Sequence, residues 1–293
     1  MNSGRGTTGS QYEYKASASG VDGELHRPSK KQVKKQVLLK LPVGGGHFCK
    51  RLDKLKLDGL VSFERAYLEV GGSHDEVHDI KTSYACSVIE GLNIAEMVRA
   101  DRVVARMSVY SPVKKYGGEH TFDITGSYFE NLKIAGHKIE LKLATFQFHE
   151  FNSCSKFTKA YAETRADDCL LFNKLGNLRQ EQLDQLVTQY DALAEISGMI
   201  KTWRKDTGRT AKPPYYCSAA SHLNLQEHTG PSSELEGYGA IICIPKFGVI
   251  RLAEIEITQD ARRLTMLRVN MCSTGHGSTT TGTVGGGPPV ITS

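Results

Sequence analysis

The chain of 293 residues is 39% hydrophobic and 24% charged, with a formal net charge of +5. This size and balance allow one large β domain or two ordinary domains, and the mild positive charge permits contact with anions without requiring it. No apolar run is long enough for a transmembrane helix, and the amino terminus lacks the apolar stretch of a secretory signal. We therefore expect a cytoplasmic protein.

The two ends of the chain have the composition of flexible segments. Residues 1–36 are rich in Gly, Ser and Thr, contain few large apolar residues and end in a basic run. Residues 273–293 form a Gly-, Thr- and Pro-rich stretch without periodicity. Segments of this kind bury too little apolar surface to fold alone. We predict a flexible basic arm (1–36), a β-rich core domain (37–272) and a flexible tail (273–293).

The cysteines give no sign of a disulfide framework. The chain has 7 of them, none arranged as CxxC, and several lie inside apolar runs, as Cys243 does in AIICIP. An odd count without paired spacing favours free, buried thiols in a reducing compartment over disulfides or a zinc site.

One nine-residue pattern occurs twice within the core. SVIEGLNIA (87–95) and SYFENLKIA (127–135) share Ser, Glu, Leu, Ile and Ala at matching positions. After the second copy, Ile139, Leu141 and Leu143 alternate with charged residues, which is the period of a half-buried strand. The Ala-Gly pair between the two runs suits a tight turn, because Gly tolerates positive φ. We therefore predict a duplicated β-hairpin.

The two predicted hairpins differ in detail. In the second, we place Tyr128, Leu132 and Ile134 on one face, with Glu130 as an exception to the alternation. In the first, four additional residues, 96–99, lengthen the connection. A surface connection tolerates such a change of length.

Two further segments show apolar alternation around a turn. LDKLKLDGLVSFERAYLEV (52–70) turns at Asp58-Gly59, and FGVIRLAEIEITQDARRLTMLRVNM (247–271) turns near residues 259–261. Both lack the Ser-x-x-Glu-x-Leu pattern. Strand pairs of this kind assemble into one antiparallel sheet system. We predict a mostly β or α+β fold: an antiparallel β-sandwich or barrel with duplicated hairpins and one long amphipathic helix.

That helix is indicated by NLRQEQLDQLVTQYDALAEISGMIKTWRK, in which apolar residues recur at intervals of three and four. Asn177 followed by Gln180 fits an N-terminal cap with a capping box, and Pro213-Pro214 lie beyond the end of the segment. We predict a helical insertion over residues 177–205 whose apolar stripe covers a sheet face.

Two short segments carry residue types used in catalysis or ligand binding. GGGHF (44–48) resembles a phosphate cradle, but no Lys-Ser/Thr follows it, and a turn leading into a strand is the simpler interpretation. FHEFNSC (148–154) brings His, Glu and Cys together in sequence, but a thiol nucleophile needs a base close in space. His149 equally fits an outward-facing strand position. We assign no catalytic residue and expect no cofactor.

The densest group of potential metal ligands is SHDEVHD (73–79). His74 and His78 share a face if the segment is helical, and Asp75 supplies a carboxylate. These three residues are the candidate metal ligands. The alternative is a solvated acidic loop that joins two strands, because Gly71-Gly72 precede the segment and no apolar periodicity supports a helix.

The basic run offers the candidate contacts to nucleic acid. Its lysines follow a flexible leader and would neutralise a few phosphates, as the basic arms of coat proteins do. The run is short, and no aromatic residues for base stacking are interleaved with it, so a solubilising flank is the alternative. The residues are Lys30, Lys31, Lys34 and Lys35.

PKFGVIRLAEIEITQDARRLTMLRVNM (245–271), with the Gly-rich tail, resembles the carboxy-terminal part of a group of uncharacterised β-rich bacterial proteins. Residues 86–107 and 125–143 are similar to strand pairs in the same group. The resemblance implies a β-rich fold and a bacterial source. No activity or site residue is assigned to that group, so none is carried over.

These observations lead to three functional hypotheses. The first is a structural, self-assembling protein without catalytic activity, a homo-oligomer through its tails or sheet edges, because apolar strands need their edges covered. The second is a coat-like nucleic-acid-binding protein that uses the basic arm. The third is a hydrolase or metal-dependent enzyme whose site is assembled from dispersed loops.

Overall fold

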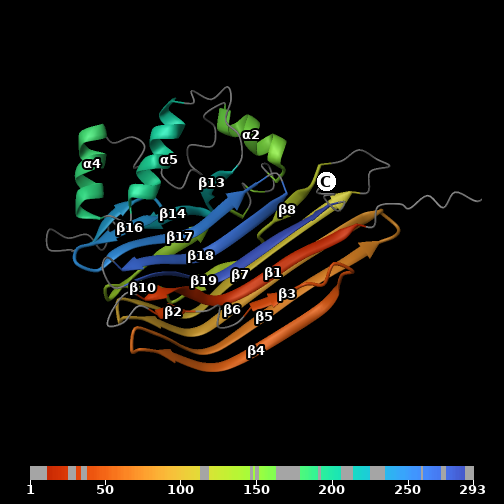
Figure 1. Ribbon diagram of the computed structural model, residues 1–293, viewed down its shortest axis with the longest axis horizontal. Coiled ribbons are helices and arrows are strands. Elements are labelled where there is room, and N and C mark those ends of the chain that lie inside the picture. The colour runs from red at the N-terminus through yellow and green to blue at the C-terminus, as the bar shows by residue number, and fades with distance from the viewer. Residues whose placement is uncertain are drawn as a thin grey trace, which may run out of the picture.

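The computed structural model describes residues 12–25, 31–33, 38–112, 119–145, 148, 152–162, 179–190, 193–205, 214–224, 235–258, 260–271 and 275–287. Most of these residues lie in strands of two large antiparallel sheets (Figure 1). The mostly β, antiparallel prediction is therefore confirmed. In the described strands both sheets are open, so the architecture is a sandwich and not a closed barrel.

Sheet B is an eight-stranded meander in the order β11-β10-β7-β6-β5-β4, with β8 and β9 also paired to β7. Its four long strands follow one another in the chain through short turns. The strands are β4 (Gly46–Leu57), β5 (Val61–Asp75), β6 (Ile80–Ile94), β7 (Val98–Pro112), β8 (Thr121–Asp123), β9 (Tyr128–Glu130), β10 (Lys133–Ile134) and β11 (His137–Lys138).

Sheet A has nine strands in the order β15-β16-β17-β18-β19-β1-β2, with β13 paired to β17 and β3 to β1. A separate two-stranded sheet joins β12 (Glu140–Leu143) to β14 (Ala220–Asn224). The strands of sheet A are β1 (Glu13–Leu25), β2 (Lys31–Val33), β3 (Leu38–Lys40), β13 (Tyr215–Ser218), β15 (Glu236–Tyr238), β16 (Ile241–Ile244), β17 (Gly248–Ile257), β18 (Ala261–Met271) and β19 (Gly275–Gly287).

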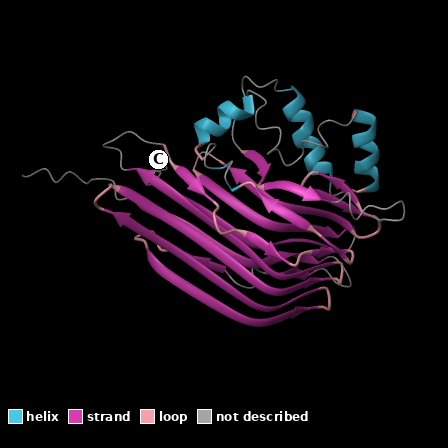
Figure 2. Cartoon of the chain, turned by 180° about the vertical axis from the view of Figure 1, so that it is seen from behind, coloured by secondary structure: helices cyan, strands magenta, loops and turns pink. Residues whose placement is uncertain are grey.

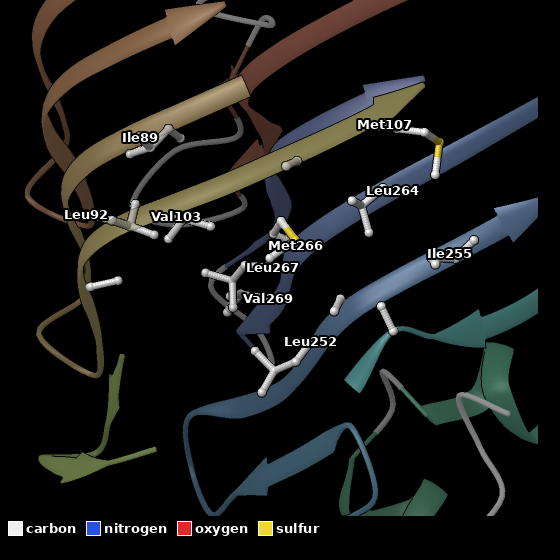
Figure 3. Packing of buried hydrophobic residues seen from close by; sticks show 14 of the residues in the cluster. Ile89, Leu92, Val103, Met107, Leu252, Ile255, Leu264, Met266, Leu267 and Val269 are labelled. Carbon is white, nitrogen blue, oxygen red and sulfur yellow. The ribbon is translucent and has the colours of Figure 1, made fainter. Parts of the chain in front are cut away.

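The inner faces of the two sheets form one hydrophobic core. Ile89 and Val103 of sheet B face Met266 and Val269 of sheet A, and all four side chains are buried (Figure 3). A polar bond also crosses between the sheets, since Ser87 Oγ donates to the Ser19 carbonyl oxygen at 2.9 Å. Ser87, the first residue of the repeated pattern, therefore ties β6 to β1.

Each of the four predicted turns joins two antiparallel strands, and three of the turns have the same geometry. The turns at Asp58-Gly59, Ala95-Glu96 and Ala135-Gly136 each place two successive residues at positive φ, which is the geometry of a type I′ hairpin. Neighbouring turns are bonded: Ala95 N–H donates to the Leu60 carbonyl oxygen at 2.5 Å, and Ala135 N–H donates to that of Met97 at 2.7 Å. The segment 52–70 therefore shares the geometry of the repeat.

Two details of the predicted hairpins are wrong. Tyr128 is 39% exposed, whereas Leu132 and Ile134 are buried, because Asn131 has φ of 49° and reverses the alternation between them. In addition, β11 ends at Lys138, and the alternating residues that follow lie in β12, which pairs with β14. The second hairpin is thus much shorter than the first.

The prediction of two flexible ends is corrected for the residues that the structure describes. β1 pairs with β19 along its whole length, from Glu13 opposite Gly287 to Leu25 opposite Gly275. Each end of the chain is thereby the partner that orders the other. β1 buries the small side chains of Ala16, Ala18 and Val21. Such residues give the segment the composition of a flexible arm, but they also fill a narrow space between two sheets.

The prediction of one long helix over 177–205 is also wrong. The segment forms α4 (Gln180–Gln189) and α5 (Ala194–Lys205), because Tyr190 is extended and buried between them. The N-cap is Arg179, two residues after the predicted cap, and its backbone N–H donates to Gln182 Oε1 at 2.9 Å. With this break, apolar residues of both helices, including Leu183 and Ile196, pack on β16.

The helices α2 (Cys154–Ala162), α4 and α5 lie together on one side of the sandwich, beside sheet A (Figure 2). In the part of the chain that the structure describes, none of the helices has the length and apolar character needed to cross a membrane.

Candidate functional site on sheet B

β4 is a long strand at one edge of sheet B (Figure 1). Among the described strands it ends the order of sheet B, with only β5 paired to it. Residues Gly46 to Arg51 are all exposed, and the side chain of Phe48 is 41% exposed. A long open edge accepts a further strand, and Lys on an edge discourages indiscriminate pairing. With His47 neutral, β4 has a net charge of +3, from Lys50, Arg51, Lys54 and Lys56 against Asp53.

A row of alternating charges crosses the outer face of sheet B from this edge. Arg65 Nε lies 3.4 Å from Asp53 Oδ1, and Arg65 Nη1 lies 3.2 Å from Glu90 Oε2. Arg102 Nη2 lies 2.8 Å from the other Glu90 oxygen, and the strand register places Glu130 opposite Arg102. Such cross-strand pairs stabilise a sheet and fix its register. The repeated Glu of the nine-residue pattern therefore belongs to this row.

Beside the charged row, alternate strands are interrupted by a residue at positive φ. Lys54 in β4, Gly91 in β6 and Asn131 after β9 have φ of 51°, 64° and 49°. We call β4, β6 and the β9–β10 segment the interrupted strands, and β5 and β7 the continuous strands. In each interrupted strand the positive-φ residue directly follows the acid of the charged row.

His47, Glu69 and Tyr84 form a hydrogen-bonded cluster on the same face. Tyr84 OH donates to Glu69 Oε1 at 2.7 Å, and His47 Nε2 lies 2.8 Å from the same oxygen. These bonds from Tyr84 and His47 lower the pKa of Glu69, whereas burial and the neighbouring Glu69 raise the pKa of Tyr84. Tyr84 is thus a neutral hydrogen-bond donor at physiological pH. Such a group suits holding the Glu69 carboxylate in place better than acid–base catalysis.

We expect Gly71→Ala to disrupt this cluster. An added Cβ would lie 2.1 Å from Tyr84 Cε1, so the ring would have to leave Glu69. Denaturant unfolding should show a loss of about 1–3 kcal/mol. In a Tyr84→Ala background the same change should cost almost nothing, because the obstructing ring is gone. An equal cost in both backgrounds would contradict this explanation.

The candidate metal ligands lie at the exposed turn between β5 and β6. His74 Nε2 is 3.0 Å from Asp79 Oδ1, while His78 Nδ1 is 2.7 Å from Asp75 Oδ2. The two histidines therefore bond to different carboxylates. Among the described residues, no group of three His, Cys, Asp or Glu side chains is placed to hold a metal ion. The metal hypothesis for His74, His78 and Asp75 rests on residue types alone: residues 73–75 end β5, and residues 76–79 form the turn to β6.

Cys154 begins α2 near the buried Arg262, the half-buried His120 and the exposed Glu119. Burial raises the pKa of the Cys154 thiol, and burial together with the charge of Arg262 lowers the pKa of His120. Both groups are thereby held in their uncharged forms, whereas a thiol nucleophile acts as the thiolate. Glu119 accepts hydrogen bonds from the backbone N–H and the hydroxyl of Ser155, so its role is to cap α2. His149 lies outside the described residues.

The remaining candidate residues that the structure describes lie in turns and strands. GGGHF (44–48) is a turn leading into β4, as predicted. Of the candidate nucleic-acid contacts, Lys31 lies in β2 and Lys30, Lys34 and Lys35 lie outside the described residues. The five cysteines that the structure places form no disulfide with one another, and of these only Cys217 and Cys243 are buried. Cys49 is exposed on β4.

The fold and this edge define a class of protein: an antiparallel two-sheet β-sandwich with repeated hairpins and one long open edge strand. The family model described as Domain of unknown function (DUF8256) matches residues 12–258, and the chain belongs to that family. The matched region contains β1 and all of sheet B but ends before β18 and β19. No curated protein and no solved structure shows a significant match.

Sequence reasoning missed the charged row and the interruptions. The repeated Glu90 and Glu130 were one available signal. Another was the acid–Arg pair that occurs twice, at 64–65 in β5 and at 101–102 in β7, the two strands that flank β6. The sequence pairs predict the charged row only when the strand register is known, because the residues of the row come from five separate segments.

Proposed function

We propose that this chain is a structural β-sandwich protein without catalytic activity, which assembles in the cytoplasm through the open edge of sheet B. The observation that carries the proposal is β4, a twelve-residue edge strand whose first six residues, Gly46 to Arg51, are exposed on both faces. A strand added to such an edge gains main-chain hydrogen bonds along its length, each worth about 0.5–1.5 kcal/mol net. The resemblance to β-rich bacterial proteins gives the proposal a bacterial setting.

The terminal segments are less suitable for assembly than the edge. β19 is paired on both sides, with β18 and with β1. An arm that reaches into a neighbouring sheet would first have to leave its own. This supports β4, and not the tails, as the contact surface of the proposed homo-oligomer.

Light scattering after size-exclusion chromatography tests this proposal. At tens of micromolar the whole chain is expected to be an oligomer. Successive residues of a strand direct their N–H groups to opposite sides, so only one of Cys49→Pro and Lys50→Pro removes an N–H from the open side. That variant should keep the wild-type melting temperature and become monomeric. A monomeric wild type, or a stable proline variant that still assembles, would count against the proposal.

The net charge of +3 on β4 favours a second candidate, binding of a polyanion such as nucleic acid. Neutralised phosphates release counterions, so affinity for an oligonucleotide would fall steeply as salt is raised. Assembly driven by main-chain hydrogen bonds should depend on salt much less. Binding that is indifferent to salt, or unchanged when Lys50, Lys54 and Lys56 are neutralised, would remove this candidate.

A further inference from the structure

Sheet B shows which strands fit beside an interrupted strand. β6 lies between the two continuous strands β5 and β7. The β9–β10 segment lies beside the continuous strand β7. In both cases the neighbouring continuous strand carries an acid followed by Arg at the interruption, Glu64-Arg65 in β5 and Asp101-Arg102 in β7.

The contacts of these residues are the same in kind. Arg65 pairs with Glu90 at 3.2 Å, and Glu64 lies over Gly91, where an added Cβ would be 2.5 Å from Glu64 Cγ. On the next interrupted strand, Asn131 Nδ2 donates to Asp101 Oδ2 at 2.6 Å. The Arg thus faces the acid of the interrupted strand, and the acid faces its positive-φ residue.

β4 presents the same two positions at its open edge. The side chain of Asp53 is 58% exposed, and Lys54 is exposed with φ of 51°. We propose that the occupant of this edge is an antiparallel polypeptide strand with an acidic residue followed by a basic one. The acid lies opposite Lys54 and the base opposite Asp53. This inference rests on the proposed function, because it specifies the partner of the same edge.

Charge complementarity favours a strand of this order over a polynucleotide. β4 itself has this order in Asp53-Lys54, so an antiparallel second copy that sets each Asp53 opposite the other Lys54 satisfies both positions. A register that sets Lys54 against Lys54 brings like charges directly opposite each other, which is destabilising. A polynucleotide would bring phosphate to Asp53 as well as to Lys54. A strand with the order acid–base satisfies both positions, and Lys54 is a better partner for its acid than Gly91 or Asn131.

Fluorescence anisotropy with labelled peptides tests the inference on the whole chain. The matched peptide has the sequence of Ser62–Val70, SFERAYLEV, and the exchanged peptide, SFREAYLEV, has the same composition with the two charges reversed. The matched peptide is expected to bind about tenfold more tightly. Lys54→Glu should abolish the preference. Lys246→Glu is the control, because Lys246 is also exposed at positive φ but lies in the turn between β16 and β17.

Several outcomes would overturn the inference. They are equal affinity of the two peptides, no binding of either at millimolar concentration, a preference that survives Lys54→Glu, and displacement of the peptide by an oligothymidylate that binds more tightly. Failure of the proposed function is distinguishable. If the chain is an oligomer and the peptides bind equally, only this inference fails. If the chain is monomeric and the peptides are discriminated, only self-assembly fails.

Discussion

Deletion of residues 272–293 is expected to abolish cooperative folding of the chain. The deletion removes β19, which lies between β18 and β1 and pairs with both over most of its length. β1 would keep only its short pairings with β2 and β3. Domains are stable by about 5–15 kcal/mol in total, and the loss of an internal strand exceeds such a margin. Calorimetry should therefore show no sharp transition.

The matched control is deletion of residues 288–293, which begin after the last residue of β19. This shorter deletion should leave the melting temperature unchanged. A chain that ends at Met271 and still melts cooperatively near the wild-type temperature would show that β19 is dispensable. The pairing of the two chain ends would then have little energetic weight.

The second large effect is expected from Glu254→Ala in β17. Glu254 is 3% exposed, and its two carboxylate oxygens lie 3.2 Å from Arg251 Nη1 and 2.7 Å from Arg268 Nη2. Removal of the carboxylate takes the charge of Glu254 away from Arg251, which is 6% exposed. Breaking a buried ion pair from one side costs about 3–5 kcal/mol, and denaturant unfolding would measure the loss.

Glu256→Ala on the same strand is the control. Glu256 pairs with Arg263 at 3.0 Å, but the Arg263 side chain is 47% exposed. Solvent screens such a pair, which contributes about 0–1 kcal/mol. The two substitutions remove the same atoms two residues apart, so burial is the main difference between them. Similar losses for both variants would contradict the electrostatic explanation for Glu254.

Local pattern was sufficient where each residue interacts mainly with its chain neighbours. The type I′ turn at Ala135-Gly136 and the strand pairs around it follow from alternation and from tolerance of positive φ. The helical period around Leu183 and Ile196 is equally local. The prediction of one continuous helix failed at Tyr190, because burial of that side chain between two helices depends on the sheet beneath them.

The sequence by itself thus determined the antiparallel strand pairs, their turns and the presence of helix beside a sheet, because these depend on side-chain period. Only the tertiary structure decided that the ends are strands: Ala16 and Thr279 are weak candidates for a core alone and are buried once β1 and β19 pair. It also decided which edge is open and how Asp53, Arg65 and Glu90 align. Those arrangements join segments far apart in the chain, and their energy exists only when the segments meet.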